Sequence, residues 1–182
     1  MNMIRIISGT NRADSNTRKI SNEIRNIYSQ LNTPCEIIDL KELPEEIFTP
    51  LAYSERPKSF EKFSTAIKTA DALVIVIPEY NGSFPGVFKY FIDMLDFPES
   101  LQEKPCCFVG VAAGMWGALR SIEQLEDIFV YRNAFVFPKS VFINNVNSFL
   151  DSSGHIINGE ILERLKNQAT DFIDFVNRFR KK

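Results

Sequence analysis

The stretch Ala72-Leu-Val-Ile-Val-Ile77 decides the fold class of this 182-residue chain. A continuous run of mostly β-branched residues is typical of a strand whose two faces are both covered, as in a parallel sheet. The loop Pro78-Glu-Tyr-Asn-Gly-Ser-Phe-Pro-Gly86 follows directly, and apolar residues then recur at helical spacing at Val87, Phe88, Phe91, Ile92 and Leu95. We therefore predict a central strand, a loop and a helix with Pro85 in its first turn and its end marked by Pro98.

The same succession of elements precedes the central strand. Residues 3–8 and 35–40 have the composition of strands, and residues 20–31 and 60–70 carry apolar residues at helical spacing. Three prolines in residues 43–57 exclude a continuous helix there, so this stretch is expected to be a loop.

The succession continues after the central strand. We expect a buried strand at residues 105–113, a helix at 119–129, an interrupted last strand at 134–137 and 141–143, and a closing helix from about 158 to 180. Five strands that alternate with five helices predict an α/β fold, in which a parallel sheet with right-handed crossovers is covered by helices on both faces.

The length and the net charge of the chain limit the kinds of partner that it is expected to bind. With 182 residues and 45% apolar residues, we expect one domain over residues 1–182. The 21 basic and 23 acidic residues leave a net charge of -2, which provides no global basic field for nucleic acid or an anionic membrane. Small molecules or proteins are the expected partners.

The cysteines favour a reduced compartment. Cys35, Cys106 and Cys107 form no CxxC pair and are expected to be buried thiols, and Cys106 and Cys107 would point to opposite faces of a strand. The single histidine, His155, lies far from them in sequence, so no metal site is expected. Because residues 1–5 begin no apolar leader and no run of eighteen apolar residues occurs, we expect a cytoplasmic protein.

The loop after the first strand, Ser8-Gly-Thr-Asn-Arg-Ala-Asp-Ser-Asn-Thr17, suits a phosphate. It leads into a helix N-terminus, whose free N–H groups and dipole favour anions, and it lacks the GxGxxG and GxxxxGK[ST] patterns. A terminal monophosphate fits it better than a pyrophosphate or a triphosphate. The candidate ligands are Thr10, Arg12, Ser15, Asn16 and Thr17. The alternative is that Asp14 or Ser15 caps the helix and Arg12 is solvated.

The loop after the central strand could hold a planar ring. A heteroaromatic ring can lie against Tyr80 while backbone groups of Asn81, Gly82 and Ser83 reach its polar edge. The alternative is an ordinary turn rich in Asn, Gly and Pro, with Tyr80 packed on its neighbours. Glu79 is expected to be a backbone-positioned or solvated loop residue rather than a proton donor.

The loop after the next strand, Ala112-Ala-Gly-Met-Trp-Gly-Ala118, is less specific. Gly114 and Gly117 would let the backbone approach a ligand, and Met115 or Trp116 could wall its ring. For Trp116 taken alone, filling a surface hollow is the better interpretation. Arg120 is expected to be a solvated helix charge rather than a phosphate contact for a nicotinamide cofactor.

Taken in chain order, the three loops resemble those of the NAD(P)H-dependent FMN reductase family, which includes quinone, chromate and azo-dye reductases. Pro78-Glu-Tyr-Asn-Gly82, followed by Pro85-Gly86 and Lys89, is similar to the isoalloxazine loop of this family and the helix after it. Gly9-Thr-Asn-Arg12 with Ser15-Asn-Thr17 resembles its phosphate loop. The resemblance implies a flavodoxin-like three-layer sandwich, with a five-stranded parallel sheet in the order 2-1-3-4-5 and helices on both faces.

The resemblance also implies the site. Thr10, Arg12, Ser15, Asn16 and Thr17 would surround the phosphate of FMN, and the ring would be edged by Pro78, Glu79, Tyr80, Asn81, Gly82 and Ser83. Gly114, Met115, Trp116 and Gly117 match the third loop of the family less closely. Two positions depart from the common pattern, since members often carry Ser where Thr10 stands and Asn where Thr17 stands; both keep hydrogen-bonding capacity.

The implied activity is a ping-pong cycle in which NADPH or NADH reduces FMN and then leaves before a quinone, free flavin or similar acceptor enters. No protein side chain is assigned as a catalytic acid or base. Family members are commonly homodimers or homotetramers, and the sixteen phenylalanines are compatible with an apolar interface. Two alternatives stay open: a flavodoxin-type electron carrier without its own nicotinamide turnover, and a flavin-free binding module of the same fold.

Overall fold

The structure, a computed structural model, describes residues 3–179. Within them, six strands form one parallel sheet in the order β2-β1-β3-β4-β5, with β6 also paired to β4. The strands are β1 (Ile4–Ser8), β2 (Cys35–Asp39), β3 (Ala72–Pro78), β4 (Pro105–Val111), β5 (Phe135–Val136) and β6 (Val141–Ile143). The strand order implied by the family resemblance is confirmed, and the interrupted last strand is resolved into β5 and β6, which pair with successive parts of β4.

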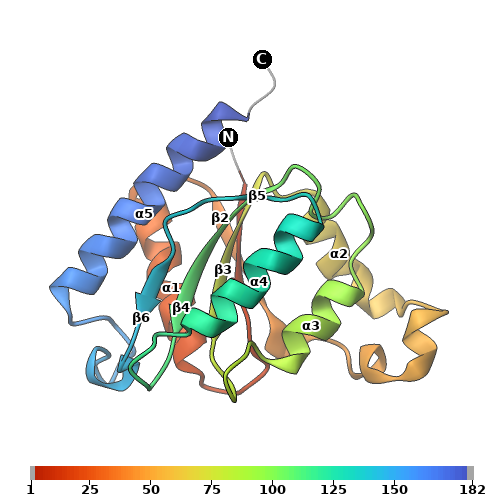
Figure 1. Cartoon of the computed structure of the whole chain (residues 1–182), viewed down its shortest axis with the longest axis horizontal. Helices are drawn as coiled ribbons and strands as arrows, with labels where there is room; N and C mark the ends of the chain where they lie inside the picture. The colour runs from red at the N-terminus through yellow and green to blue at the C-terminus, as the bar shows by residue number, and fades with distance from the viewer. Residues whose placement is uncertain (1–2, 180–182) are drawn as a thin grey trace.

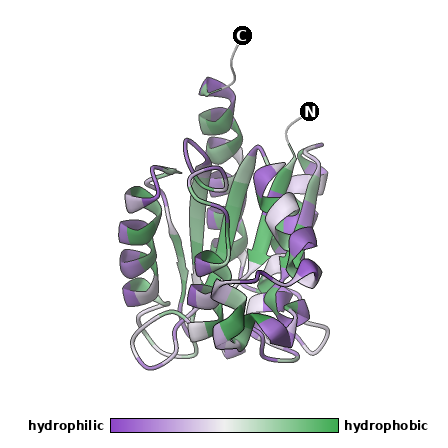
Figure 2. Ribbon diagram, turned by 90° about the vertical axis from the view of Figure 1, so that its right-hand side faces the viewer, coloured by the Kyte–Doolittle hydropathy of each residue, from purple (hydrophilic) through white to green (hydrophobic). Residues whose placement is uncertain are grey.

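Helices cover both faces of the sheet. They are α1 (Asn16–Gln30), α2 (Glu61–Lys68), α3 (Gly86–Asp93), α4 (Leu119–Tyr131) and α5 (Gly159–Arg178). Apolar residues of α1 and α5 pack on one face, and those of α2, α3 and α4 pack on the other (Figure 1). Figure 2 shows the consequence in hydropathy, with apolar strands inside and polar helix faces outside.

The residues of β3 divide between the two cores. Leu73, Ile75 and Ile77 belong to the core under α2, α3 and α4, whereas Val74 and Val76 belong to the core under α1 and α5. Every residue of β3 is buried. The continuous apolar run that predicted a strand covered on both faces is therefore explained by its central position between β1 and β4.

Several expected boundaries were wrong by a few residues. Pro85 is the N-cap of α3 rather than part of its first turn, because its backbone is extended with ψ of 139°. α3 ends at Asp93, before Pro98. Residues 43–57 hold no α-helix but include two 3₁₀ turns, Glu45–Phe48 and Pro50–Tyr53. The expected end of the closing helix, Arg180, lies outside the described residues.

The three cysteines are free thiols, and two of them are buried as expected. Cys106 and Cys107 point into opposite cores, and burial raises the pKa of both thiols. The expectation was wrong for Cys35, which is half-buried at the start of the edge strand β2, where β1 pairs with it on one side only. None of the helices within residues 3–179 is long and apolar enough to cross a bilayer.

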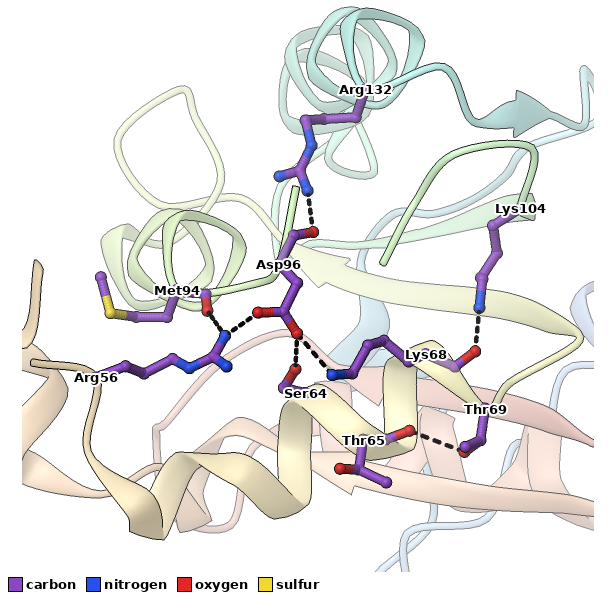
Figure 3. Close-up of polar contacts among 9 residues, drawn as sticks. All are labelled: Arg56, Ser64, Thr65, Lys68, Thr69, Met94, Asp96, Lys104 and Arg132. Atoms are coloured by element: carbon purple, nitrogen blue, oxygen red, sulfur yellow. Dashed lines mark hydrogen bonds and ion pairs between the residues drawn. The ribbon is translucent and has the colours of Figure 1, made fainter. Parts of the chain in front are cut away.

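Asp96 is a polar hub that ties together segments far apart in sequence (Figure 3). Its carboxylate accepts a hydrogen bond from the Ser64 hydroxyl at 2.7 Å and forms ion pairs with Lys68, at 2.8 Å, and Arg56. Its backbone carbonyl accepts from Arg132 Nη2 at 2.8 Å. The Lys68 ammonium and the other donors hold the pKa of this carboxyl well below its usual range. The hub therefore fastens α2 and the end of α4 to the loop after α3.

We expect Asp96→Asn to lower the free energy of unfolding by about 2 kcal/mol at neutral pH, because a partly buried charged acceptor of three donors is lost. A carboxylate with a lowered folded-state pKa stabilises the fold above its unfolded pKa of about 3.9, and that stabilisation is lost as the pH falls through the folded-state pKa. Urea unfolding of both proteins at several pH values measures this. The difference should persist down to about pH 5 and shrink below about pH 4.

Asp93→Asn is the matched control, since Asp93 forms an exposed i,i+4 ion pair with Lys89. Such pairs contribute about 0.3–0.5 kcal/mol. An Asp96→Asn loss as small as that of Asp93→Asn, or one of equal size at pH 7 and pH 3, would contradict the role of the hub.

Candidate cofactor site

A cavity of about 600 Å³ opens at the carboxyl edge of the sheet. Four segments line it, namely residues 12–17, 78–80, 111–113 and 146–147, which lie at or after the ends of β1, β3, β4 and β6. The corresponding loops lie together along the lower edge of the sheet in Figure 1. The volume is typical of a small-molecule site, and the position, between β1 and β3 where the strand order reverses, is the usual ligand site of such sheets.

The first loop brings free backbone donors to this cavity. Ser15 is the N-cap of α1, and its hydroxyl accepts from the Arg18 N–H at 3.1 Å, so the capping alternative holds for that side chain. Within the described chain, however, the N–H groups of Ser15, Asn16 and Thr17 have no acceptor. The Arg12 side chain, at the same cavity, forms no ion pair with any described residue. This arrangement is suited to a phosphate group.

The second loop is a tight turn held by its own backbone. Tyr80 N donates to Ser83 O at 2.7 Å, and Ser83 N donates to Tyr80 O at 3.1 Å. Asn81 and Gly82 between them have φ of 54° and 77°, which is why the sequence needs Asn-Gly here. Pro78, Glu79 and Tyr80 line the cavity, whereas Asn81, Gly82 and Ser83 lie beyond its lining.

Side chains connect this turn to two other elements. The hydroxyls of Tyr80 and Thr10 are 2.9 Å apart, and Ser83 Oγ donates to Gln124 Oε1 in α4 at 2.6 Å. Thr10 is fully buried and lies outside the cavity lining, so its hydroxyl joins the first two loops. Glu79 Oε2 is buried and has no hydrogen-bond partner among the described residues.

The third loop contributes Ala112 and Ala113 to the cavity, while Gly114, Met115, Trp116 and Gly117 lie outside the lining. Met115 is 68% exposed and Trp116 57%, so Trp116 fills no surface hollow. Gly117, at φ of 58°, is a packing glycine, since a Cβ there would lie 2.9 Å from Phe142 Cβ in β6.

Seven lining residues were not among the predicted site residues, namely Ala13, Asp14, Val111, Ala112, Ala113, Val146 and Asn147. The first five lie in or beside the predicted loops, whereas Val146 and Asn147 belong to a segment that the sequence analysis did not single out. They follow β6, whose carboxyl end opens on the same edge, and that position is the signal that could have found them. Asn16 Nδ2 donates to Asn147 Oδ1 at 2.7 Å, and Val146 N donates to Ala112 O at 3.1 Å. The segment after β6 thereby closes the cavity between the first and third loops.

We expect Tyr80→Phe to lower the free energy of unfolding by about 1 kcal/mol, because the buried Thr10 hydroxyl keeps the Arg12 N–H as a donor but loses its side-chain partner. Tyr90→Phe is the matched control: both tyrosines are 37% exposed, and no hydrogen bond of the Tyr90 hydroxyl is found among the described residues. Denaturant unfolding of the two variants makes the comparison. Equal losses would show that the Tyr80–Thr10 contact contributes nothing of its own.

The fold and the cavity define a flavodoxin-like α/β protein with its ligand site at the point where the strand order reverses. Residues 2–148 match the family model described as NADPH-dependent FMN reductase. The chain belongs to this family.

Individual proteins similar to this chain are consistent with that family. The chain is 35% identical over 126 residues to a quinone reductase of Escherichia coli, covering 67% of each protein. It is 30% identical over 127 residues to an NAD(P)H-dependent FMN reductase of Pseudomonas aeruginosa, covering 68% of this chain and 69% of that protein. Among solved structures, the flavoenzyme NAD(P)H:(acceptor) oxidoreductase FerB of Paracoccus denitrificans superposes with a TM-score of 0.82 at 19% identity over 98% of both chains. That last likeness supports the fold.

Proposed function

We propose that the protein is an FMN-dependent oxidoreductase that takes hydride from NAD(P)H and reduces quinones, free flavin or similar acceptors by a ping-pong mechanism. The observation that carries the proposal is the cavity of about 600 Å³, which combines a helix N-terminus with free N–H groups and the Pro78–Tyr80 loop, in a chain of the FMN reductase family. FMN supplies the chemistry when bound, since it can accept a hydride and release it to a second substrate.

The cavity residues fit the two ends of FMN. Among the described residues, the free N–H groups at Ser15–Thr17 and the Arg12 side chain without an ion pair suit the phosphate. The apolar Val111 and Ala112 lie beside the Pro78–Tyr80 segment, since Val111 pairs with Pro78, and they suit a ring. Glu79 Oε2 adds a buried acceptor without a partner, which a ligand N–H would satisfy.

We assign the residues accordingly. The phosphate group would be held by Thr10, Arg12, Ser15, Asn16 and Thr17, with Thr10 acting through its contact with Tyr80. The ring would be edged by Pro78, Glu79, Tyr80, Asn81, Gly82 and Ser83. Gly114, Met115, Trp116 and Gly117 would border its open side, and the exposure of Met115 and Trp116 leaves them free to cover a substrate there.

The protein's own contribution is orientation. The Tyr80–Ser83 turn is fixed by its backbone pair, by Thr10 and by Gln124, so the ring edge meets groups that do not have to reorganise. No described side chain is assigned as a proton donor or acceptor in the reaction, because the hydride chemistry belongs to the cofactor.

The test is the spectrum of the purified, FMN-loaded protein, followed by anaerobic reduction with NADPH and with NADH and by steady-state turnover with a quinone. We expect bound flavin that is bleached by a nicotinamide and reoxidised by the quinone. Bound flavin that neither nicotinamide reduces would replace this proposal by an electron carrier, and a protein that takes up no FMN would replace it by a binding module.

Assembly and location complete the proposal. Four large side chains are 37–64% exposed, namely Phe48, Leu51, Tyr53 and Tyr90. The ring centroids of Phe48 and Tyr90 lie 5.2 Å apart. Such a patch supports a homodimer or homotetramer, which sedimentation of the purified protein tests. The three free thiols support a reducing, cytoplasmic location. We further propose that residues 1–182 act as one FMN-binding domain.

A further inference from the structure

A second, smaller cavity of about 300 Å³ lies between α1 and the carboxyl end of β2, and we call it the basic groove. Its lining residues are Arg12, Asp14, Ser15, Arg18, Lys19, Asn22, Asp39 and Lys41. Four cationic and two anionic side chains leave this small region with a formal charge of +2, although the whole chain carries -2. A locally positive concave surface on an acidic protein attracts anions.

Asp39, the last residue of β2, organises the groove. Its Oδ2 atom lies 3.5 Å from Arg18 Nε, and its Oδ1 atom accepts from the Lys41 backbone N–H at 3.1 Å. Its side chain is only 15% exposed. The Asp39 carboxylate is therefore engaged by the Arg18 guanidinium and by the backbone at Lys41.

Donors in the groove remain unused. Arg18 Nη1 is buried and has no hydrogen-bond partner among the described residues. The Lys41 ammonium also takes part in no ion pair or hydrogen bond with any residue that the structure describes. A buried N–H without an acceptor raises the free energy of the folded protein, so a ligand that accepts a hydrogen bond from it would be stabilised in the groove. A guanidinium fork beside an ammonium is the usual protein complement of a phosphate dianion.

The groove adjoins the cofactor cavity without coinciding with it. Arg12, Asp14 and Ser15 line both, but Asn16 and Thr17 line the cofactor cavity and not the groove, whereas Arg18 and Lys41 line the groove and not the cofactor cavity. A cofactor phosphate held by Arg12, Ser15, Asn16 and Thr17 therefore leaves Arg18, Lys19 and Lys41 available in the groove. The groove is open to a second phosphate that arrives with the substrate.

We propose that the basic groove binds the 2′-phosphate of NADPH and makes the protein prefer NADPH to NADH. The proposal rests on the proposed function, because the nicotinamide must lie over a flavin while the adenosine half extends beyond the cofactor cavity. NADPH and NADH differ by this single phosphate, so a cationic site outside the cofactor cavity discriminates between them.

Lys41→Gln tests the proposal, because Lys41 is exposed and only its backbone bonds to the protein. We expect the ratio of kcat/KM for NADPH to kcat/KM for NADH to fall about tenfold, the effect of one charge-assisted contact of ~1.4 kcal/mol. Lys166→Gln on α5 is the matched control, with an exposed lysine outside both cavities, and should keep the wild-type ratio. An unchanged ratio in Lys41→Gln would overturn the proposal, as would equal losses with the two nicotinamides, since those would place the shared pyrophosphate in the groove.

A binding measurement separates this inference from the proposed function. Calorimetry of the FMN-loaded protein should show adenosine 2′,5′-bisphosphate binding at least tenfold more tightly than AMP, with most of that difference lost in Lys41→Gln. Equal affinities for the bisphosphate and for AMP would overturn the proposal even if the protein oxidises both nicotinamides. Inhibition of NADH and NADPH turnover alike by inorganic phosphate would assign the groove to a free anion instead. Conversely, failure of both nicotinamides to reduce the flavin would remove the proposed function, while bisphosphate binding would still report on the groove.

Discussion

Ser15→Asp is expected to weaken FMN binding on the order of 1000-fold without weakening the fold. Ser15 borders the cofactor cavity and is the N-cap of α1, and aspartate caps helices as well as serine does. A carboxylate at a helix N-terminus is also favoured by the helix dipole. Against a bound phosphate, however, two like charges about 4 Å apart repel by roughly 4 kcal/mol at an effective dielectric constant of 20. Fluorescence titration of the flavin-free protein with FMN measures the dissociation constant, and thermal unfolding measures the stability.

Ser15→Asn is the matched control, because asparagine has the shape and capping ability of aspartate without its charge. It should retain most of the FMN affinity. If the Asp and Asn variants bound FMN equally well, the phosphate would lie away from the N-terminus of α1. If both lost affinity equally, the size of the side chain rather than its charge would be responsible.

The strands, helices and turns of this fold can largely be predicted from local sequence. The β-branched run of β3 can be covered on both faces only in the middle of a parallel sheet, so Ala72–Ile77 identified both its structure and its place. The Asn81-Gly82 pair likewise predicted a turn, because both residues adopt positive φ. Boundaries were less certain, and Pro85 shows why: a fixed φ suits an N-cap as well as a first turn, and only ψ distinguishes them.

The lining of the cavity was only partly predictable, because it depends on contacts between distant residues. The Thr10 and Tyr80 hydroxyls meet across 70 residues of sequence, and the Asn16 and Asn147 side chains across 131. Nothing in either local stretch shows these partners. The two glycines that bracket Trp116 predict that a ligand can approach, and the structure adds that Gly117 lets the loop approach β6. A glycine signals close contact without revealing what makes it.

Asp96, which lies outside the site, also makes contacts that local sequence does not predict. Its sequence neighbours, Leu95 and Phe97, are apolar, and its charge partners Arg56 and Lys68 come from segments that precede β3. An ion pair of this kind depends on the packing of α2 against the loop after α3. Sequence periodicity predicted the helices α2 and α3, but it contains no information about which of their polar residues meet.

Gly110→Ala is expected to have the largest effect on stability, lowering the free energy of unfolding by about 3 kcal/mol or more. Gly110 lies in β4 between Ile77 of β3 and Phe142 of β6, and a Cβ there would overlap the carbonyl oxygen of Gly117. That oxygen cannot withdraw, because Gly117 itself packs against Phe142 and Ile143. The strain would pass to the third loop, so FMN affinity should fall as well, since Ala112 and Ala113 line the cavity.

Gly114→Ala is the control that makes this prediction specific to close packing. Gly114 lies in the third loop, as Gly117 does, but a Cβ there would have no atom within 4 Å. Its replacement should therefore change the stability by less than about 0.5 kcal/mol. Urea unfolding of the two variants gives the comparison, with an unchanged m-value expected if the folded state stays compact. Similar losses in both would mean that the flexibility of the loop matters more than the contact of Gly110 with Gly117. A large loss in Gly110→Ala alone would show that the fold depends on the close approach of Gly110 to Gly117.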